Sequence, residues 1–148
     1  MRIFIRRRIT LEEILERIEK LRSIYGNIET VYKQALSSDT RLLEIYLEWK
    51  ALRDALKEYE EDGETLYTIE QEVKPEIARR LFTKNMLKLL GEVRSSESIS
   101  ALASKVGRSV ANVYRDLKFL ESIRVVVLRR EGKRLRPELL MRELVLQL

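Results

Sequence analysis

The stretch SISALASKVGRSVANVYRDLKFLE, residues 98–121, contains two helical patterns separated by a glycine. Ser98 precedes a short pattern and Ser109 precedes a longer one, and serine is among the preferred residues at a helix N-cap. Gly107 lies between them, where a glycine can end a helix in the left-handed conformation and permit a tight turn. We therefore expect a helix-turn-helix across these residues. Its first helix places four apolar residues inward: Ile99, Leu102, Ala103 and Val106.

The second helix of this pair, residues 110–121, has two different faces. Val113, Leu117 and Leu120 fall within a narrow arc, which predicts the core face. Exposed arginine and lysine side chains on a helix are most often simply solvated, so their presence alone does not indicate a binding site. The opposite face and its flanks carry Ala111, Arg115, Lys118 and Ser122, with Asn112 and Tyr114 beside them.

Strand-like segments follow the helix pair, and a helix beginning at Thr83 precedes it. RVVVL at 124–128 and RREGKR at 129–134 predict two strands joined by a turn at Gly132, and ELVLQL at 143–148 is expected to close the same sheet. Three helices followed by a basic hairpin are typical of a winged helix-turn-helix. The expected fold class is mainly α with a small β-hairpin wing, an α+β protein.

Charge divides the 148-residue chain into two unlike halves. Residues 1–75 hold 13 Lys and Arg against 16 Asp and Glu, a net of −3, whereas residues 76–148 hold 16 against 8, a net of +8. A basic half joined to a mildly acidic half indicates a module that binds polyanions, attached to a part with another task. We place the boundary so that residues 1–72 form a helical N-terminal domain and residues 73–148 form the winged domain.

The acidic half predicts helices behind a basic strand at residues 2–6. Thr10 and Glu13 form a capping box that opens a helix with Leu11, Ile14, Leu15, Ile18 and Leu21 on one face. A shorter helix is expected at 28–36, and Asp39 caps a long one over 40–62. Residues 66–69 could form a strand that pairs with residues 2–6.

The long helix is apolar on two sides. One line of large residues includes Trp49, and a second line of Leu43, Leu47, Ala51 and Ala55 lies well round the cylinder. A helix with two apolar sides needs two partners, and symmetric dimers are the commonest oligomers. The alternative is that the short helix and the strand cover this side within one monomer. We expect a homodimer or partner interface at Leu43, Leu47, Trp49, Ala51 and Ala55.

Composition excludes several classes of protein. The chain has no cysteine and no histidine, which excludes disulfide frameworks, zinc fingers and Cys- or His-based catalysis. The acidic run EYEEDGE at 58–64 fits no defined metal site, and the five glycines are too scattered for a phosphate-binding loop. We therefore expect no enzyme activity, no metal, no cofactor and a cytoplasmic location without membrane contact. Three Asn and three Gln beside abundant Glu, Lys and Arg suggest a thermophilic source.

The basic half also resembles an archaeal family of winged-helix proteins described as transcriptional regulators. The resemblance covers roughly residues 80–148, and its most specific part is GRSVANVYRDLKFLE, followed by REGKRLRP and the closing ELVLQL. It implies that Asn112, Tyr114, Arg115 and Lys118 face DNA from a recognition helix, and that Arg129, Arg130, Lys133 and Arg134 form the wing. Members of such families often lie beside toxin-like genes.

One residue departs from the family pattern. The family usually ends its third helix with a glycine before the wing strand, whereas this chain has Arg124. A residue other than glycine must either adopt the left-handed conformation or reshape the turn. The angle between the helix and the wing therefore depends on how this turn is built.

The combination of exposed helix and basic hairpin predicts a surface that binds DNA. An amide and a guanidinium near the start of a helix are suited to reading base edges in the major groove. Tyr114 either bonds a phosphate or props the helix, and the wing cations could instead protect an edge strand. The predicted site comprises Arg108, Ser109, Asn112, Tyr114, Arg115 and Lys118 in the helix and Arg129, Arg130, Lys133, Arg134 and Arg136 in the wing.

Three functions remain open from the sequence. The first is a dimeric regulator, by default a repressor, that binds double-stranded DNA. The second is an antitoxin whose N-terminal half binds a toxin-like protein, while the winged domain controls its own operon. The third is an architectural chromatin protein with little sequence preference. Binding of single-stranded RNA is disfavoured, because the basic half lacks a cluster of exposed aromatic residues.

Overall fold

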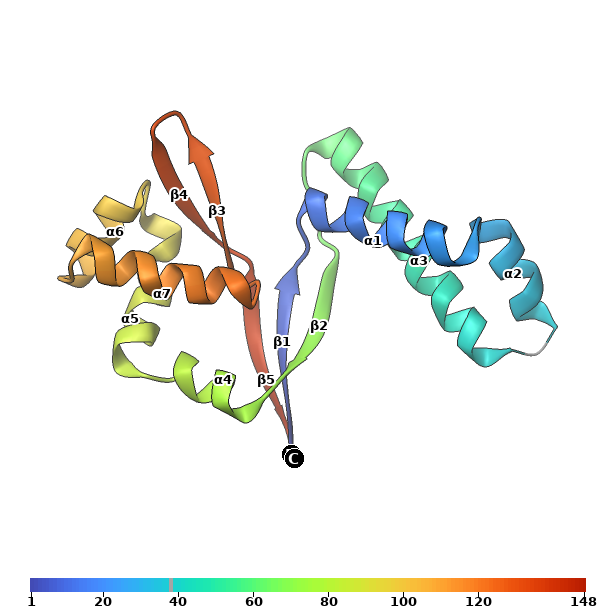
Figure 1. Cartoon of the computed structure of the whole chain (residues 1–148), viewed down its shortest axis with the longest axis horizontal. Coiled ribbons are helices and arrows are strands. Elements are labelled where there is room, and N and C mark those ends of the chain that lie inside the picture. Colours follow the sequence, from blue (N-terminus) through green and yellow to red (C-terminus); the bar gives the residue numbers. More distant parts are fainter. Residues whose placement is uncertain (38) are drawn as a thin grey trace. The chain divides into compact units, whose positions relative to one another are not determined.

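A computed structural model describes residues 1–37 and 39–148, and the chain divides into two compact units (Figure 1). The helical unit is Ile9–Thr68, and the winged unit combines Met1–Arg8 with Ile69–Leu148. The first eight residues therefore fold with the C-terminal half, which the predicted boundary at 72/73 does not anticipate. The reason is β-pairing, because strand β1 (Arg2–Arg8) pairs with the last strand, β5 (Met141–Gln147).

The helical unit consists of α1 (Leu11–Tyr25), α2 (Ile28–Leu36) and α3 (Thr40–Asp62). Each helix begins at a polar cap, since the side chains of Thr10, Asn27 and Asp39 accept hydrogen bonds from the backbone of the first turn. Gly26 and Gly63 end α1 and α3 at positive φ. The predicted N-cap at Thr10 and all three predicted helices are confirmed.

The core of the helical unit centres on Trp49, which packs with Ile28 and Val31. Ile14 and Ile18 of α1 are buried. Leu11 and Leu15 were expected on the same face, but they are 37% and 48% exposed. The buried stripe is narrower than predicted, because successive residues lie about 100° apart around a helix and these two fall at its margin.

The winged unit contains a three-stranded sheet in the order β2-β1-β5, where β2 is Thr68–Val73. Strands β1 and β5 are antiparallel, with Ile5 opposite Leu144. The prediction that the last strand joins the hairpin sheet is wrong, since β3 (Val126–Glu131) and β4 (Arg134–Leu139) pair only with each other in the described sheets. The strand predicted at 66–69 begins later, at Thr68, and it does lie beside β1.

The two faces of this sheet differ in polarity. Ile3, Ile5 and Arg7 of β1 are buried, whereas Arg2 and Arg6 project from the other face. Arg2 lies 2.9 Å from a carboxylate oxygen of Glu72, and its hydrogen bond lowers the pKa of Glu72. Arg6 bridges the sheet, with its guanidinium nitrogens 2.6 Å from Glu70 and 2.8 Å from Glu143. These exposed pairs add little stability but favour one register.

The helices of the winged unit are α4 (Pro75–Leu81), α5 (Lys84–Glu92), a 3-10 turn (Val93–Ser95), α6 (Ile99–Val106) and α7 (Val110–Ser122). Helices α5, α6 and α7 are the three predicted ones. Helix α4 was not predicted, although Pro75 followed by Glu76 is a recognised helix start and could have indicated it.

One apolar core joins these helices to the hairpin and to the sheet. Leu89, Leu102, Leu117 and Leu120 are fully buried in it, and Ile5 of β1 belongs to the same cluster. The fold is therefore mixed α+β, with a C-terminal hairpin after the helices in a winged-helix-like arrangement, as predicted (Figure 1). Across the described residues, no helix is long and apolar enough to cross a membrane.

Candidate nucleic-acid interface

The turn between α6 and α7 is built as the sequence predicts. Gly107 ends α6 at a φ of 69°, and the backbone N–H of Arg108 then donates to the carbonyl of Ala103 at 3.0 Å. Ser109 begins α7, because its hydroxyl accepts from the N–H of Asn112 at 3.2 Å. The turn thus directs α7 away from α6 within three residues.

Helix α7 presents a polar outer face. Val113, Leu117 and Leu120 have no exposed surface, whereas Asn112 and Arg115 are exposed. Within the described part of the chain, the side chains of Asn112 and Arg115 make no hydrogen bond or ion pair. An amide and a guanidinium without protein partners are available to a ligand.

Lys118 lies on the same outer face but is already engaged. Its ammonium is 2.8 Å from a carboxylate oxygen of Glu121, and this hydrogen bond raises the pKa of Lys118. The other oxygen of Glu121 accepts from the backbone N–H of Leu128 at 3.3 Å. Glu121 therefore ties α7 to β3, and Lys118 reaches a ligand only by exchanging this partner.

Arg108, which the sequence predicts as a DNA contact, forms an ion pair within the helix-turn-helix. Its guanidinium lies 2.8 Å from Asp116, and only about a fifth of each side chain is exposed: 21% and 22%. The Nη1 atom of Arg108 is buried without a hydrogen-bond partner. A partly buried, charge-assisted pair across the turn fixes the start of α7, so Arg108 is less available than Arg115.

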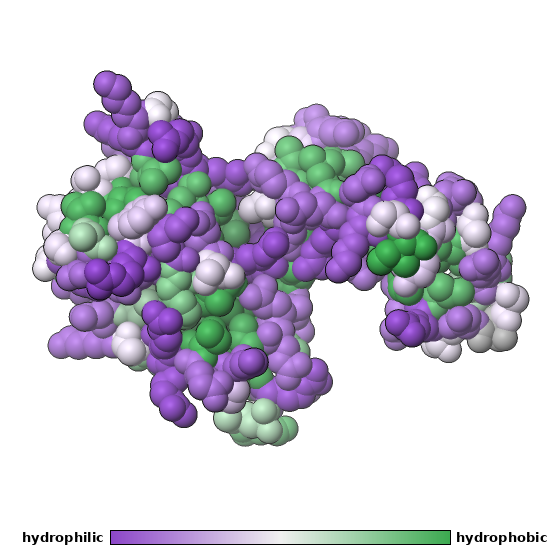
Figure 2. All heavy atoms as spheres, in the orientation of Figure 1, coloured by the Kyte–Doolittle hydropathy of each residue, from purple (hydrophilic) through white to green (hydrophobic). Residues whose placement is uncertain are grey.

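The wing is a tight hairpin whose tip is Gly132 and Lys133. Glu131 pairs with Arg134 across the turn, and Gly132 has a φ of 63°. One face of the hairpin packs on the core through Val126, Leu128 and the buried Pro137. Figure 2 shows a hydrophilic surface at the projecting tip.

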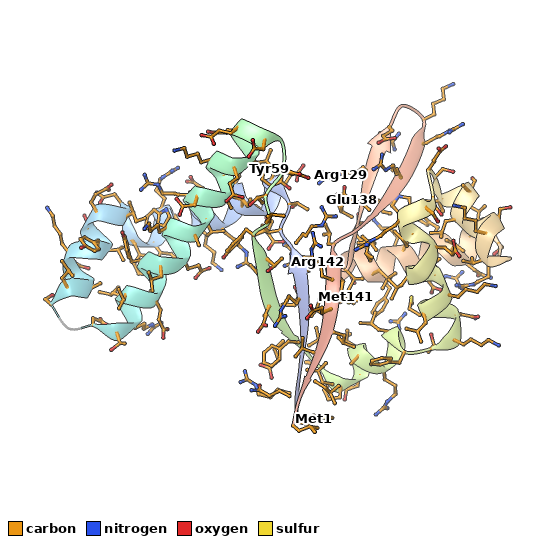
Figure 3. All side chains as sticks on the ribbon, turned by 180° about the vertical axis from the view of Figure 1, so that it is seen from behind. Met1, Tyr59, Arg129, Glu138, Met141 and Arg142 are labelled. Atoms are coloured by element: carbon orange, nitrogen blue, oxygen red, sulfur yellow. The ribbon has the colours of Figure 1, made fainter. Side chains whose placement is uncertain are left out.

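The wing cations divide into paired and available groups. Arg129 lies 3.3 Å from Glu138 near the base of the hairpin (Figure 3), and Arg136 lies 3.1 Å from Glu131. The other three, over the described residues, have no ion-pair or hydrogen-bond partner: Arg130, Lys133 and Arg134. The available positive charge therefore gathers toward the tip.

Helix α7 and the wing tip line one hollow. Val110 and Tyr114 of α7 line it together with residues 97–101 at the start of α6, and Lys133, Arg134 and Leu135 complete it from the wing. Tyr114 is 42% exposed there. From the predicted site, Tyr114 of α7 and Lys133 and Arg134 of the wing thus line the same hollow. Asn112, Arg115 and Lys118 are not among its lining residues.

Sequence reasoning missed Arg94, which lies on the other side of β4. Arg94 and Ser95 line a second hollow with Arg134 and Arg136 of the wing. Lys105 of α6 holds this segment by donating to the carbonyl and hydroxyl of Ser95. The available signal was a basic residue five positions before Ile99, where that helix starts. No cluster suited to a metal ion occurs among the residues that the structure describes.

The predicted interface on α3 is only partly exposed. Leu43 is 40% exposed and Leu47 is 54% exposed, and Ala51 is partly covered. Trp49 and Ala55 are 3% and 1% exposed, because they belong to the core of their own helical unit. Contact with a partner along α3 would therefore involve Leu43 and Leu47 rather than Trp49 or Ala55.

Comparison with protein families adds one match. The family model HVO_A0114 matches residues 81–146. The matched segment contains the helix-turn-helix, the wing and nearly all of β5, but not β1, β2 or the helical unit. A comparison with curated proteins finds no match.

Proposed function

We propose that the protein is a sequence-specific regulator that binds double-stranded DNA through α7 and the wing. The observation that carries this proposal is the hollow that Val110 and Tyr114 of α7 share with the wing tip. Asn112 and Arg115 add two exposed side chains of α7 that have no hydrogen-bond or ion-pair partner among the described residues. A net charge of +8 over residues 76–148 supports a polyanionic ligand.

The chemistry of each group suits a different part of the duplex. Arg115 offers a bidentate fork that matches guanine O6 and N7, and Asn112 matches adenine N6 and N7. Lys133 and Arg134 at the wing tip suit phosphate oxygens, which position a protein without reading sequence. Tyr114 contributes a phenolic hydroxyl that can donate to a phosphate between them. In this assignment α7 reads the bases and the wing binds the backbone.

Regulation by occupying a promoter needs no catalytic group, and we assign none. The helical unit is proposed to form a homodimer through the exposed leucines of α3. A dimer would bind a pseudo-palindromic site whose half-sites lie about one helical turn apart, roughly 34–36 Å, or a multiple of it.

An antitoxin is the second candidate, and the observation that favours it is also on the helical unit. Leu11, Leu15, Leu43 and Leu47 of the helical unit are 37%, 48%, 40% and 54% exposed. A toxin-like protein could occupy these leucines instead of a second copy. Co-purification with a second small protein would favour the antitoxin, whereas a homodimer of the isolated chain favours the regulator.

Selection of duplexes from a random pool tests the main proposal. We expect the full-length protein to enrich one sequence motif, and to footprint that motif at lower concentration than a scrambled duplex. Enrichment without a motif would favour the architectural alternative. An absence of binding to any duplex at low salt would refute DNA binding altogether.

A further inference from the structure

The turn between α7 and β3 contains a residue in an uncommon conformation. Arg124 has a φ of 60°. Among the described residues, it is the one residue other than glycine with a positive φ. A left-handed conformation is unfavourable for an ordinary residue, because its Cβ approaches the following carbonyl. Such a residue persists only where the surrounding structure determines it.

Two backbone hydrogen bonds hold the turn from the side of the helix. The N–H of Arg124 donates to the carbonyl of Glu121 at 3.0 Å, and the N–H of Val125 donates to the carbonyl of Leu120 at 2.9 Å. These bonds fix the end of α7, but they leave the carbonyl of Ile123, directly before Arg124, for another donor.

Gln71 of strand β2 supplies that donor. Its Nε2 lies 2.8 Å from the carbonyl oxygen of Ile123. Gln71 projects from the partly covered face of β2, whereas its neighbours Glu70 and Glu72 are exposed. A side chain of the sheet thus holds the peptide that enters the left-handed residue.

Arg7 sets which way the Gln71 amide points. The Nε of Arg7 donates to Oε1 of Gln71 at 2.6 Å, and Arg7 is 1% exposed. A guanidinium is a donor only. The amide oxygen of Gln71 must therefore face Arg7, which leaves the NH₂ group directed at Ile123.

The next residue, Arg8, holds the base of the wing. Its backbone N–H donates to the carbonyl of Leu140 at 2.9 Å, and its Nη2 donates to the carbonyl of Leu139 at 2.7 Å. The same nitrogen lies 3.2 Å from Glu138, which also pairs with Arg129. Two adjacent residues of β1 therefore reach both the end of α7 and the base of the hairpin.

We propose that Gln71 is a positioning residue for DNA reading, which fixes the angle between α7 and the wing through the Ile123–Arg124 turn. This inference rests on the proposed function. Because α7 and the wing tip line one hollow, a duplex can contact both only when their relative angle is held. Gln71 itself touches no base or phosphate in this scheme.

The variant that tests this role is Gln71→Glu. The carboxylate of the variant still accepts a hydrogen bond from the buried Arg7, but it has no N–H group to donate to the carbonyl of Ile123. Its second oxygen instead faces the carbonyl oxygen of Ile123, and the two oxygens repel each other. The matched control is Glu72→Gln, the reverse exchange at the next residue, whose side chain lies on the exposed face of the same strand. Thermal unfolding of both variants establishes that each is folded at the assay temperature.

The first measurement needs no DNA. Hydrogen–deuterium exchange of the full-length protein should show faster exchange across residues 123–128 in Gln71→Glu, by about two- to tenfold, the factor expected for one net hydrogen bond. The control variant should match the wild type there. Unchanged exchange in Gln71→Glu would overturn the inference, whether or not the protein binds DNA.

The second measurement is the ratio of affinities for the selected duplex and for a scrambled duplex of the same composition. A loss of folded protein lowers both affinities by the same factor, so it leaves this ratio unchanged. Loss of positioning should lower the ratio by about two- to tenfold and leave the control near the wild-type value. Faster exchange in Gln71→Glu together with an unchanged affinity ratio would overturn the positioning role. A wild type that binds the selected and scrambled duplexes equally well would refute the proposed function, but it would leave the exchange result unaffected.

Discussion

Arg115 is the residue whose removal tests the reading of bases most directly. It is exposed and without a protein partner in the described structure, so an alanine there removes no internal contact. We expect Arg115→Ala to lose about 1–3 kcal/mol at the selected duplex and to relax the preference at one base pair. Titrations of the selected and scrambled duplexes at fixed salt measure both effects.

Arg142→Ala is the matched control, since it removes an equally exposed arginine from β5 (Figure 3). It should lower the affinity for both duplexes slightly and alike. If Arg115→Ala behaves in the same way as this control, α7 is not the recognition helix.

The wing cations make a different prediction, because they are expected to meet phosphates. Lys133→Ala should weaken binding to all duplexes and reduce the slope of log K against log salt by roughly one unit. Arg136→Ala should change the slope less, since Glu131 at 3.1 Å already offsets that charge. Affinities measured over several salt concentrations give both slopes, and equal slopes for the two variants would contradict the division of the wing into paired and available cations.

The sequence predicts which side chains of α7 face outward. It predicts less well which of these side chains are free of a partner within the protein and so can bind a ligand. The spacing of Val113, Leu117 and Leu120 suffices to locate the outer face of α7. It does not reveal that Arg108 pairs with Asp116 or that Lys118 pairs with Glu121. The first of these pairs depends on the path of the turn, which periodicity does not give. The second has the i,i+3 spacing at which helix side chains can meet, but the spacing does not fix the rotamers that form the pair.

At the scale of elements, local features were predicted and distant pairings were not. Helix starts at Thr10, Ser98 and Ser109 depend on a few neighbouring residues, and the structure confirms them. The partner of β5 lies at the opposite end of the chain, and the alternation of a strand says nothing about which strand it meets. The wing was therefore predicted correctly, whereas the sheet behind it was not.

This pairing predicts that residues 73–148 are not an independent folding unit. Residues 73–148 alone lack β1, which removes the fully buried Ile5 from the core and leaves β5 with two open edges. Losing one buried isoleucine side chain typically costs about 2–5 kcal/mol, and exposed edges promote aggregation. We expect this fragment to aggregate or to melt well below the full-length protein in circular dichroism.

A second fragment provides the comparison. Residues 1–8, joined through a flexible linker to residues 69–148, retain every strand of the sheet that the winged unit uses. This fragment should unfold cooperatively at a temperature near that of the winged unit in the whole protein. Equal melting temperatures for the two fragments would show that β1 is dispensable.

At the scale of the whole molecule, the two units carry different candidate surfaces. The winged unit carries the basic hairpin and the outer face of α7, and the helical unit carries the exposed Leu43 and Leu47 on α3. Both connections between the units run through adjacent strands, because β1 leads into α1 and β2 returns from α3. Arg7 and Gln71 lie on these two strands, so the residues that hold the α7 turn are also close in sequence to the helical unit.

Leu47→Glu tests whether the exposed leucines of α3 join two copies. Leu47 is 54% exposed, so a glutamate there should leave the fold of the helical unit intact while placing a charge against its symmetry mate. We expect light scattering to give a dimer for the wild type and a monomer for this variant, with similar helix content by circular dichroism. Affinity for a two-half-site duplex should fall to that for a single half-site, because the second contact is no longer intramolecular.

Lys57→Glu introduces the same residue at an exposed position of α3 outside the apolar line, and it should remain dimeric. A wild type that is monomeric at assay concentrations would refute the proposed homodimer. A dimeric Leu47→Glu would show that the contact between the two copies lies on another surface.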